Sequence, residues 1–459
     1  MKTKNRLRIA SEQKLGARQV NATGLSRLIK KMRRYLVNVT WLFAGKIVRM
    51  MFSLLVGIWV ARYLGVEQFG ILSYGIAFAM LLRSVAMFQL EGICVREIIK
   101  TPAEKDNILG SAFVLSFVAG LFSFLIVVNS IALIRPDDPV YCILVSIVGF
   151  GLIFLCFEVF DYWFQSQLDA KPVVVARTIV LSFSAALKVS AILLHAPLVF
   201  FAWITLVELI LMGGALVLAN MCSGQNITKL RVKVKWLKKL LCDAWPLALS
   251  GMAATIYLRI DIIMVGEMMG AQDVGIYTAA TRLAEAAYFL PICIMATLYP
   301  AVVKSLENKN VDSEIRMQQV YNLMILMGYG VGIIATLFAG PVINFLFGEQ
   351  FQQSSQVLSM YIWSGVFVNI AMAKSAYLKA RNFTTILFVS TFTGAVVNVL
   401  LNLILIKEYG VTGAVWATII SYSIEAYFIL FLFPCTRKQA FMISRAFVMP
   451  IIRFKDITS

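Results

Sequence analysis

Twelve apolar stretches of about 20 residues or more restrict the fold of this chain more than any other feature. A helix of about 20 apolar residues crosses the hydrocarbon core of a bilayer. With 60% hydrophobic and only 14% charged residues, the composition also lies far from that of soluble proteins. The sequence therefore predicts an all-α, polytopic membrane protein with twelve transmembrane helices. The stretches lie at residues 37–61, 70–90, 108–133, 140–164, 172–194, 198–220, 244–266, 275–301, 318–347, 354–377, 383–406 and 412–434.

Positive charge lies mostly on one side of the predicted membrane. Most of the 42 Lys and Arg residues fall in the two tails and in the alternate loops on the same side as the N-terminal tail, whereas the opposite loops carry Arg62, Arg135 and Lys407. By the positive-inside rule, both termini face the cytoplasm. The net charge of +18 is thus explained by topology and does not indicate a nucleic-acid partner. A full-length span follows the basic N-terminal tail, so we expect no cleaved signal peptide.

A basic segment, Met221–Asp243, divides the twelve spans into six and six. Its run KLRVKVKWLKKLL suits either an ordinary cytoplasmic loop or a segment lying on the anionic inner leaflet. We therefore expect five parts along the chain. They are a basic cytoplasmic tail (1–35), an N-lobe of six spans (36–221), a basic linker (222–243), a C-lobe of six spans (244–434) and a cytoplasmic tail (435–459).

Similar stretches join the first and second spans of each half. LGVEQFGILS (residues 64–73) aligns with MGAQDVGIYT (residues 269–278) at an offset of 205 residues. Glycines at both ends of a short polar loop permit the tight turn between two antiparallel helices. The pattern predicts two pseudo-symmetric six-helix bundles in the same orientation, with a transport site where they meet.

Six ionisable side chains lie inside the predicted spans of the first half. The cations are Lys46, Arg49, Arg83 and Lys188, and the acids are Glu158 and Glu208. Each central charge costs roughly 2.5–3.5 kcal/mol on insertion scales, and two acids cannot neutralise four cations. We therefore hypothesise a wet, cationic cavity in which these four cations bind phosphate or acidic sugars. The alternative is that Arg83 and Lys188 pair with Glu158 and Glu208 and simply join helices.

The second half carries a more acidic set of embedded charges: Arg259, Asp261, Arg282, Glu285 and Glu425. Arg282 and Glu285 are three residues apart and share a helix face, whereas Arg259 and Asp261 point in different directions. We expect Asp261 to meet Arg282 across the helical hairpin, as a structural or gating pair.

The sequence disfavours an enzyme. Its single histidine and scattered cysteines offer no metal cluster or His-based catalysis, no Walker motif is present, and the predicted outer loops are short. We expect no cofactor, and transport driven by an ion gradient or by the substrate gradient. A polymerase of membrane-bound glycans is a weaker alternative, because such enzymes usually need a larger outer loop.

Three runs resemble the Wzx-type polysaccharide flippases, within the superfamily of multidrug, oligosaccharidyl-lipid and polysaccharide exporters. They are ARYLGVEQFGILSYGIAFAML (61–81), DIIMVGEMMGAQDVGIYTAATRLAEAAYFLP (261–291) and YGVTGAVWATIISYSIEA (409–426). The resemblance spans nearly the whole chain, although the basic N-terminal tail is longer than is usual for the family.

This resemblance implies a MATE-like fold in the bacterial inner membrane. The implied cargo is an undecaprenyl-diphosphate-linked oligosaccharide repeat unit, moved from the cytoplasmic to the periplasmic leaflet for O-antigen or another surface polysaccharide. It also implies that Asp261, Arg282 and Glu285 occupy charged positions of the family, and that cations of the first lobe face the lumen. Expected partners are membrane lipids, a coupling ion (H⁺ or Na⁺) and polysaccharide polymerase machinery. An ion-coupled small-molecule or multidrug exporter of the same fold is the alternative, and it would favour acids in the cavity.

Overall fold

The computed structural model describes residues 2–225, 227–307 and 312–448, which form helices and their connections. The first half contains eight α-helices: α1 (Lys2–Leu81), α2 (Arg83–Met87), α3 (Leu90–Lys100), α4 (Lys105–Ile134), α5 (Pro139–Phe154), α6 (Val159–Ser166), α7 (Lys171–Leu193) and α8 (Leu198–Cys222). The second half contains nine: α9 (Val234–Met268), α10 (Ala271–Ala287), α11 (Phe289–Glu307), α12 (Asp312–Phe347), α13 (Gln353–Tyr361), α14 (Ser364–Ala380), α15 (Thr384–Tyr409), α16 (Val411–Ala426) and α17 (Arg437–Val448). Short 3₁₀ turns occupy Pro102–Glu104, Leu155–Glu158, Ile227–Lys229, Glu349–Phe351 and Phe428–Phe431.

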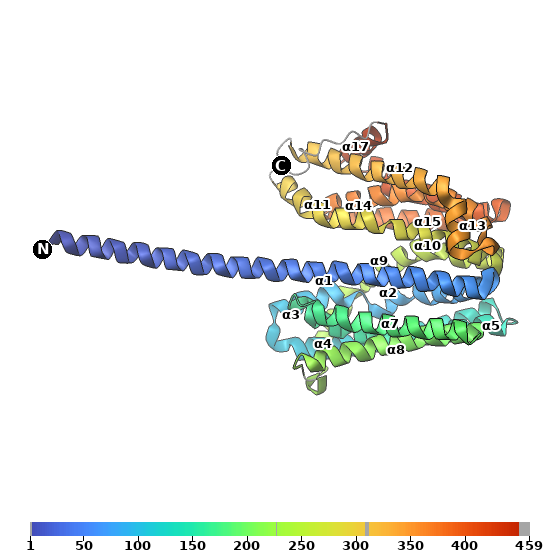
Figure 1. The fold of residues 1–459 in the computed structure, drawn as a ribbon, viewed down its shortest axis with the longest axis horizontal. Helices are drawn as coiled ribbons and strands as arrows, with labels where there is room; N and C mark the ends of the chain where they lie inside the picture. The colour runs from blue at the N-terminus through green and yellow to red at the C-terminus, as the bar shows by residue number, and fades with distance from the viewer. Residues whose placement is uncertain (1, 226, 308–311, 449–459) are drawn as a thin grey trace.

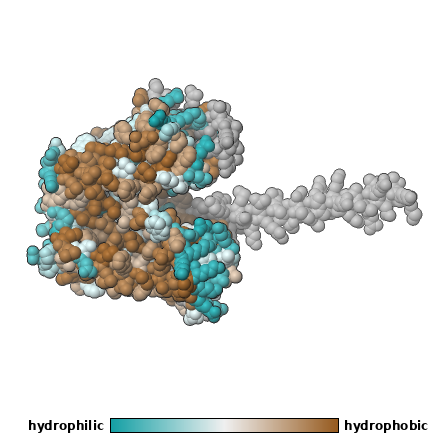
Figure 2. Space-filling view, turned by 180° about the vertical axis from the view of Figure 1, so that it is seen from behind, coloured by the Kyte–Doolittle hydropathy of each residue, from teal (hydrophilic) through white to brown (hydrophobic). Residues whose placement is uncertain are grey.

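Eleven helical segments of the described chain are long and apolar enough to cross a membrane. The first, Thr40–Leu81, has a non-helical residue at Gly65, where the chain folds back, so it supplies two crossings. Apolar surface covers the middle of the molecule, and hydrophilic residues gather towards its two ends (Figure 2). The prediction of an all-α polytopic membrane fold is confirmed.

The helices form two groups, which lie close together at one end of the molecule and further apart at the other (Figure 1). We call α1–α8 the N-lobe and α9–α17 the C-lobe. The lobes meet at one end of the molecule, which we call the far end, and they diverge towards the opposite end, from which α1 extends and which we call the basic end (Figure 1). α1 is helical from Lys2 and continuous with the first span.

Positive backbone φ angles explain the first glycine of each repeated stretch. Gly65 has φ 76° and ψ 175°, and Gly270 has φ 108° and ψ −177°. Side chains disfavour this region of the Ramachandran plot, so both turns require glycine. The predicted hairpin at the start of each half is therefore present.

The second glycine of each stretch has another role. Gly70 and Gly275 are helical, and each lies against the backbone of the other lobe: a Cβ on Gly70 would lie 1.8 Å from the Ala271 carbonyl oxygen, and one on Gly275 would lie 2.0 Å from the Val66 carbonyl oxygen. The two contacts are related by the 205-residue offset. The hairpins thus cross backbone to backbone at the far end, and we call this contact the glycine crossing.

Further polar contacts join the lobes at the far end. Arg135, which follows α4, donates to Glu267 at 2.9 Å and to the Gly266 carbonyl at 2.7 Å, both near the end of α9. Tyr74 also donates to Glu267, at 2.5 Å. The far end is therefore closed by the glycine crossing together with an ion pair between the lobes.

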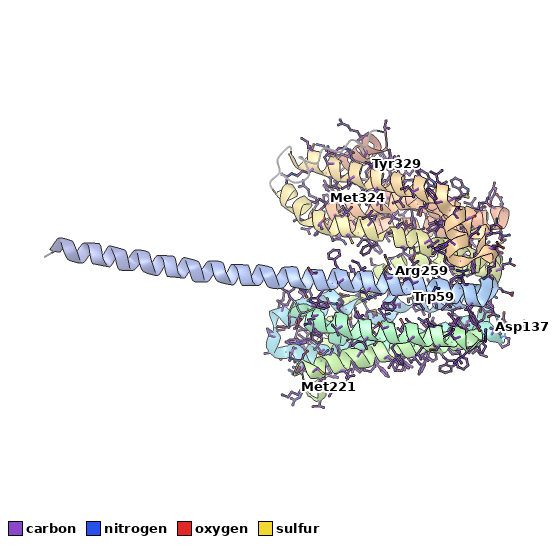
Figure 3. All side chains as sticks on the ribbon, viewed as in Figure 1. Trp59, Asp137, Met221, Arg259, Met324 and Tyr329 are labelled. Carbon is purple, nitrogen blue, oxygen red and sulfur yellow. The ribbon has the colours of Figure 1, made fainter. Side chains whose placement is uncertain are left out.

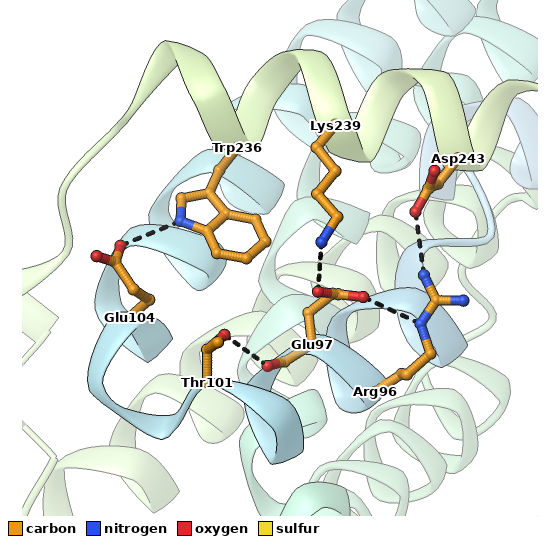
Figure 4. Close-up of polar contacts among 7 residues, drawn as sticks. All are labelled: Arg96, Glu97, Thr101, Glu104, Trp236, Lys239 and Asp243. Atoms are coloured by element: carbon orange, nitrogen blue, oxygen red, sulfur yellow. Dashed lines mark hydrogen bonds and ion pairs between the residues drawn. The ribbon is translucent and has the colours of Figure 1, made fainter.

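The start of α9 docks onto the N-lobe, although most of this helix belongs to the C-lobe (Figure 4). Trp236 is buried and donates to Glu104 at 3.1 Å, and Lys239 donates to Glu97 at 2.5 Å. The hydrogen bond from Lys239 lowers the pKa of the Glu97 carboxyl, against the opposing effect of burial. This part of the basic linker therefore packs on the N-lobe. Its composition was also compatible with a segment lying on the inner leaflet.

Candidate functional site

A cavity of about 360 Å³ lies where the two lobes approach one another. It is open on one side and is bounded by α1 from the N-lobe and by α9 and α10 from the C-lobe. Its lining includes Met50, Ser53, Ser73, Arg259, Thr278, Arg282 and Glu285. The sequence predicts a transport site where the two bundles meet, and whether this cavity is that site stays a prediction.

Charged residues of the C-lobe form one wall of this inter-lobe cavity. Arg259 contacts both carboxylate oxygens of Glu285 at 3.2 Å, which gives a bidentate pair between α9 and α10. Arg282 instead lies over the ring of Phe69, 5.0 Å from its centre, so a C-lobe cation packs on the N-lobe. A Cβ on Gly57 would lie 2.5 Å from the Arg282 guanidinium, so glycine makes room for this contact. Arg259 lies at the junction of the lobes (Figure 3).

Two hydroxyls of the cavity lining have no hydrogen-bond partner within the described chain. They belong to Ser73 and Thr278, which are buried and are again related by the 205-residue offset. Because buried polar groups are normally satisfied, an orphan pair beside a cavity indicates a place for water or for hydroxyls of a ligand.

None of the four predicted N-lobe cations is among the residues that line the cavity, but three of them lie towards the basic end from it, on α1 or at the start of α2. Lys46 lies one helical turn from Met50, and Arg83 lies one turn beyond Met80, which also lines the cavity. Arg49 lies between the cavity face of α1 and the face that packs on α7. The side chains of Lys46 and Arg49 are exposed, and that of Arg83 is half-buried. None of the three has an acid within ion-pair distance in the described part of the chain.

A mixed cluster of charges surrounds Arg49. Arg83, Arg177, Glu158 and Asp161 all lie within electrostatic range of its guanidinium. Arg177 forms ion pairs with Glu158 and, at 3.0 Å, with Asp161. Arg177 of α7 therefore neutralises both acids of the cluster, and Arg49 and Arg83 keep their charge unpaired. Glu91 adds one further acid within range of Asp161.

Lys188 lies apart from the other predicted cations. Its ammonium contacts Glu208 at 2.8 Å, and Ser184 donates to the same carboxylate. The pair joins α7 to α8. Lys188 and Glu208 thus form the helix-joining pair that the sequence allowed as the alternative to phosphate binding. The other pair of that alternative, Arg83 with Glu158, is not formed, because Glu158 pairs with Arg177 instead.

Asp261 has different partners from the one expected. Its carboxylate accepts hydrogen bonds from Asn402 at 2.6 Å, Thr418 at 2.7 Å and Tyr277 at 3.0 Å, and it is buried inside the C-lobe. The expected contact with Arg282 is therefore wrong, because the Asp261 side chain points towards α15 and α16 and Arg282 points towards the N-lobe. A buried carboxylate held only by neutral donors can accept a proton or a monovalent cation.

The sequence also missed a buried ion pair in the C-lobe. Lys374 of α14 was not among the predicted site residues, and its side chain is only 1% exposed. It contacts the Glu425 carboxylate, the Glu425 carbonyl oxygen at 2.6 Å and the Ser390 hydroxyl at 3.1 Å. The hydrophobic residues on both sides of Lys374 in the chain were the available sign of burial.

Within the residues that the structure describes, no group of three or more His, Cys, Asp or Glu side chains is placed to hold a metal ion. Unpaired cations, two orphan hydroxyls and a cavity between two lobes can accommodate an anionic, hydroxyl-bearing ligand.

The sequence is similar to two family profiles and to several known proteins. A family profile described as polysaccharide biosynthesis protein matches residues 35–306, and one described as MatE matches residues 246–404. A probable low-salt glycan biosynthesis flippase, Agl15, of Haloferax volcanii is 23% identical over 179 residues, which are 38% of this chain and 38% of that protein. A putative O-antigen transporter of Shigella dysenteriae is 28% identical over 178 residues, which are 38% of this chain and 44% of that protein. The matches thus span about two fifths of these curated relatives.

Solved structures share the fold over most of the chain. An inward-facing multidrug resistance MATE family transporter of the MOP superfamily superposes with a TM-score of 0.71 at 16% identity, covering 85% of this chain and 94% of that one. The lipid II flippase MurJ in an inward closed conformation gives 0.69 at 16% identity, covering 90% of this chain and 91% of that one. The family profile covers more than half of the sequence, and the chain belongs to the polysaccharide biosynthesis protein family.

Proposed function

We propose that this protein is a flippase that moves an undecaprenyl-diphosphate-linked oligosaccharide repeat unit from the cytoplasmic to the periplasmic leaflet. The product would be used for O-antigen or another surface polysaccharide. The main observation that supports this proposal is that Lys46, Arg49 and Arg83 are unpaired cations. They lie near the inter-lobe cavity, towards its basic end. Two relatives, named as a probable low-salt glycan biosynthesis flippase and a putative O-antigen transporter, support the same class of cargo.

Charge sign is the physical reason for preferring a phosphate-bearing cargo. An uncompensated cation inside a membrane costs roughly 2.5–3.5 kcal/mol on insertion scales, so three unpaired cations need a polar passage or an anionic partner. A diphosphate supplies several acceptor oxygens, and Arg binds them by charge-assisted, bidentate hydrogen bonds. Ser73 and Thr278, further inside the cavity, would then meet sugar hydroxyls.

Alternating access would proceed by rocking of the two lobes. In the state described here the far end is closed by the glycine crossing and by Arg135 with Glu267, while the lobes diverge at the basic end. The basic end would face the cytoplasm of a bacterial cell and the far end the periplasm. A coupling ion, H⁺ or Na⁺, would bind at Asp261. The side chains that donate hydrogen bonds to this carboxylate are all neutral, and the side-chain amide oxygen of Asn402 beside it has no hydrogen-bond partner within the described chain.

The test is complementation of a strain that lacks the gene. We expect Lys46→Ala and Arg49→Ala to abolish surface polysaccharide while the protein still accumulates in the membrane, and Arg49→Lys to restore part of it. Lys188→Ala serves as a control, because Lys188 is paired with Glu208 away from the cavity and should affect accumulation more than transport. Normal polymer from both alanine variants would refute the assignment.

An ion-coupled exporter of small molecules is the second candidate, and the MatE profile over residues 246–404 favours it. Such an exporter of organic cations needs an unpaired acid in its cavity. In the described structure Glu285 pairs with Arg259 and Glu425 pairs with Lys374, which weakens this alternative. It would gain support if deletion of the gene changed drug resistance and left surface glycan intact. A deletion strain that still displayed single repeat units outside would point instead to a polymerase.

A further inference from the structure

A second, larger cavity lies within the C-lobe. Its volume is about 770 Å³, within the 300–1,000 Å³ typical of ligand pockets. It is formed by α9, α11, α14 and α16, of which α11 and α14 run side by side in the upper group of Figure 1. We call it the C-lobe pocket.

The lining of the C-lobe pocket is mostly apolar. Ile292, Met295 and Ala296 come from α11, and Phe367 and Ala371 come from α14. Among its charged groups, the carboxylate of Glu425 is already neutralised by Lys374 behind the wall. Lys379 lies in the last turn of α14, at the basic end of the pocket. The pocket thus offers an apolar interior with one cation at its cytoplasmic margin.

The C-lobe pocket continues the inter-lobe cavity along two helices. On α9, Tyr257 and Leu258 line the pocket, and the next residue, Arg259, lines the cavity. On the neighbouring helix pair, Glu285 of α10 lines the cavity and Ile292 of α11 lines the pocket. The two spaces are therefore lined by neighbouring parts of the same helix in α9 and of the consecutive helices α10 and α11.

The pseudo-symmetry places opposite chemistries on the two lobes. The 205-residue offset relates Lys46 to Gly251, Arg49 to Ala254 and Arg83 to Tyr288. The positions that carry unpaired cations in the N-lobe therefore carry uncharged residues in the C-lobe. A ligand held between the lobes would meet cations on one side and apolar surface on the other, which suits an amphipathic molecule.

We infer that the C-lobe pocket binds the proximal part of a polyisoprenoid chain whose phosphate end lies on Lys46, Arg49 and Arg83. The inference rests on the proposed function, and it adds that the lipid chain enters the protein instead of staying wholly in the bilayer. Tethering explains the choice of occupant: once the phosphate is bound, the chain is at high effective concentration beside an apolar pocket. A phospholipid acyl chain has similar chemistry but lacks this link to the cation site.

The experiment measures binding of undecaprenyl phosphate and of geranyl phosphate to the full-length protein in nanodiscs. Ala296→Trp fills the pocket from an accessible position on α11. We expect it to lower the affinity for undecaprenyl phosphate at least about tenfold, because several buried CH₂ and CH₃ groups lose their contacts. The affinity for geranyl phosphate should fall less, because its two isoprene units make fewer contacts in the pocket. Ala186→Trp, on the exposed outer face of α7, is the matched control and should change neither affinity.

Other variants separate failure of the pocket from failure of the proposed function. Arg49→Ala should weaken both phosphates, since both use the cation site. If Arg49→Ala weakens both but Ala296→Trp leaves undecaprenyl phosphate binding intact, the pocket assignment is overturned and the flippase proposal stands. If Arg49→Ala affects neither, the proposed function itself fails.

Photo-cross-linking identifies the occupant. Undecaprenyl phosphate with a diazirine in its first isoprene units should label peptides of α11 and α14, and excess unlabelled undecaprenyl phosphate should suppress the labelling. Phosphatidylglycerol with a diazirine in its acyl chain should label them weakly. Equal labelling by phosphatidylglycerol, without competition from undecaprenyl phosphate, would overturn the assignment in favour of a general lipid site.

Discussion

Substitution of Gly70 by alanine should shift the protein away from the state that is closed at the far end. Gly70 and its symmetry mate Gly275 hold the lobes together through direct backbone contact. The added methyl group changes little in an isolated helix, where alanine is more favourable than glycine. Any loss of far-end closure must therefore come from the contact between lobes.

The structure gives the size of the clash. A Cβ on Gly70 would lie 1.8 Å from the Ala271 carbonyl oxygen, whereas ordinary van der Waals contact begins near 3.4 Å. The neighbouring atom is backbone, so the lobes must separate locally by roughly 1.5 Å. Overpacking of this kind costs about 1–3 kcal/mol. Such a cost changes the ratio of closed to open far ends by roughly 5- to 150-fold.

Pulsed electron paramagnetic resonance can measure this shift in a cysteine-free background. Spin labels at Glu67→Cys and Gln272→Cys occupy exposed positions, related by the offset, on the two sides of the crossing. We expect one short distance in the parent protein and a growing longer-distance population in Gly70→Ala and Gly275→Ala. Gly214→Ala is the control, because a Cβ there meets nothing within 4 Å. Unchanged distances in both crossing variants would refute the reasoning.

Three further predictions concern other parts of the molecule. Lys374→Met should destabilise the purified protein by about 3–5 kcal/mol, because it leaves the Glu425 carboxylate buried and unpaired, and adding Glu425→Gln should recover much of the loss in thermal unfolding. The pKa of Glu97 is lowered mainly by the hydrogen bond from Lys239, so linker docking should hold at neutral pH and weaken as the pH falls below the ordinary value of 4.5; a melting temperature that drops there equally in Glu97→Gln would contradict this. Burial raises the pKa of Cys94 to about 12, so this thiol should resist iodoacetamide at pH 8 until the protein is denatured, as mass spectrometry of labelled peptides can show.

The membrane fold could be predicted almost entirely from local sequence. Hydropathy located the crossing segments because a spanning helix must satisfy its own backbone, which leaves few alternatives. The turns at Gly65 and Gly270 were also predicted, since their glycines stand between two apolar stretches. The role of Gly70 and Gly275 was not, because a close approach between lobes depends on tertiary packing that no local pattern records.

Charge partners were the least predictable part of the site. Helical spacing showed which ionisable groups share a face but not which helix lies opposite. Arg177 and Lys374 were not among the predicted site residues, yet each forms an ion pair with an acid inside the protein. Asp261 is held by neutral donors from two distant helices. Pairing between helices depends on rotation and tilt, which hydropathy does not determine.

Direct binding of undecaprenyl diphosphate tests the central claim, that unpaired N-lobe cations hold a phosphate-bearing lipid. The measurement compares the wild-type protein in nanodiscs with Lys46→Ala, Arg49→Ala and Arg83→Ala at two salt concentrations. Each lost charge-assisted contact is worth about 1.5–3 kcal/mol, so the account predicts an affinity loss of roughly tenfold or more per substitution, with a weaker salt dependence in each variant. Equal affinity in the wild-type protein and all three variants would contradict it.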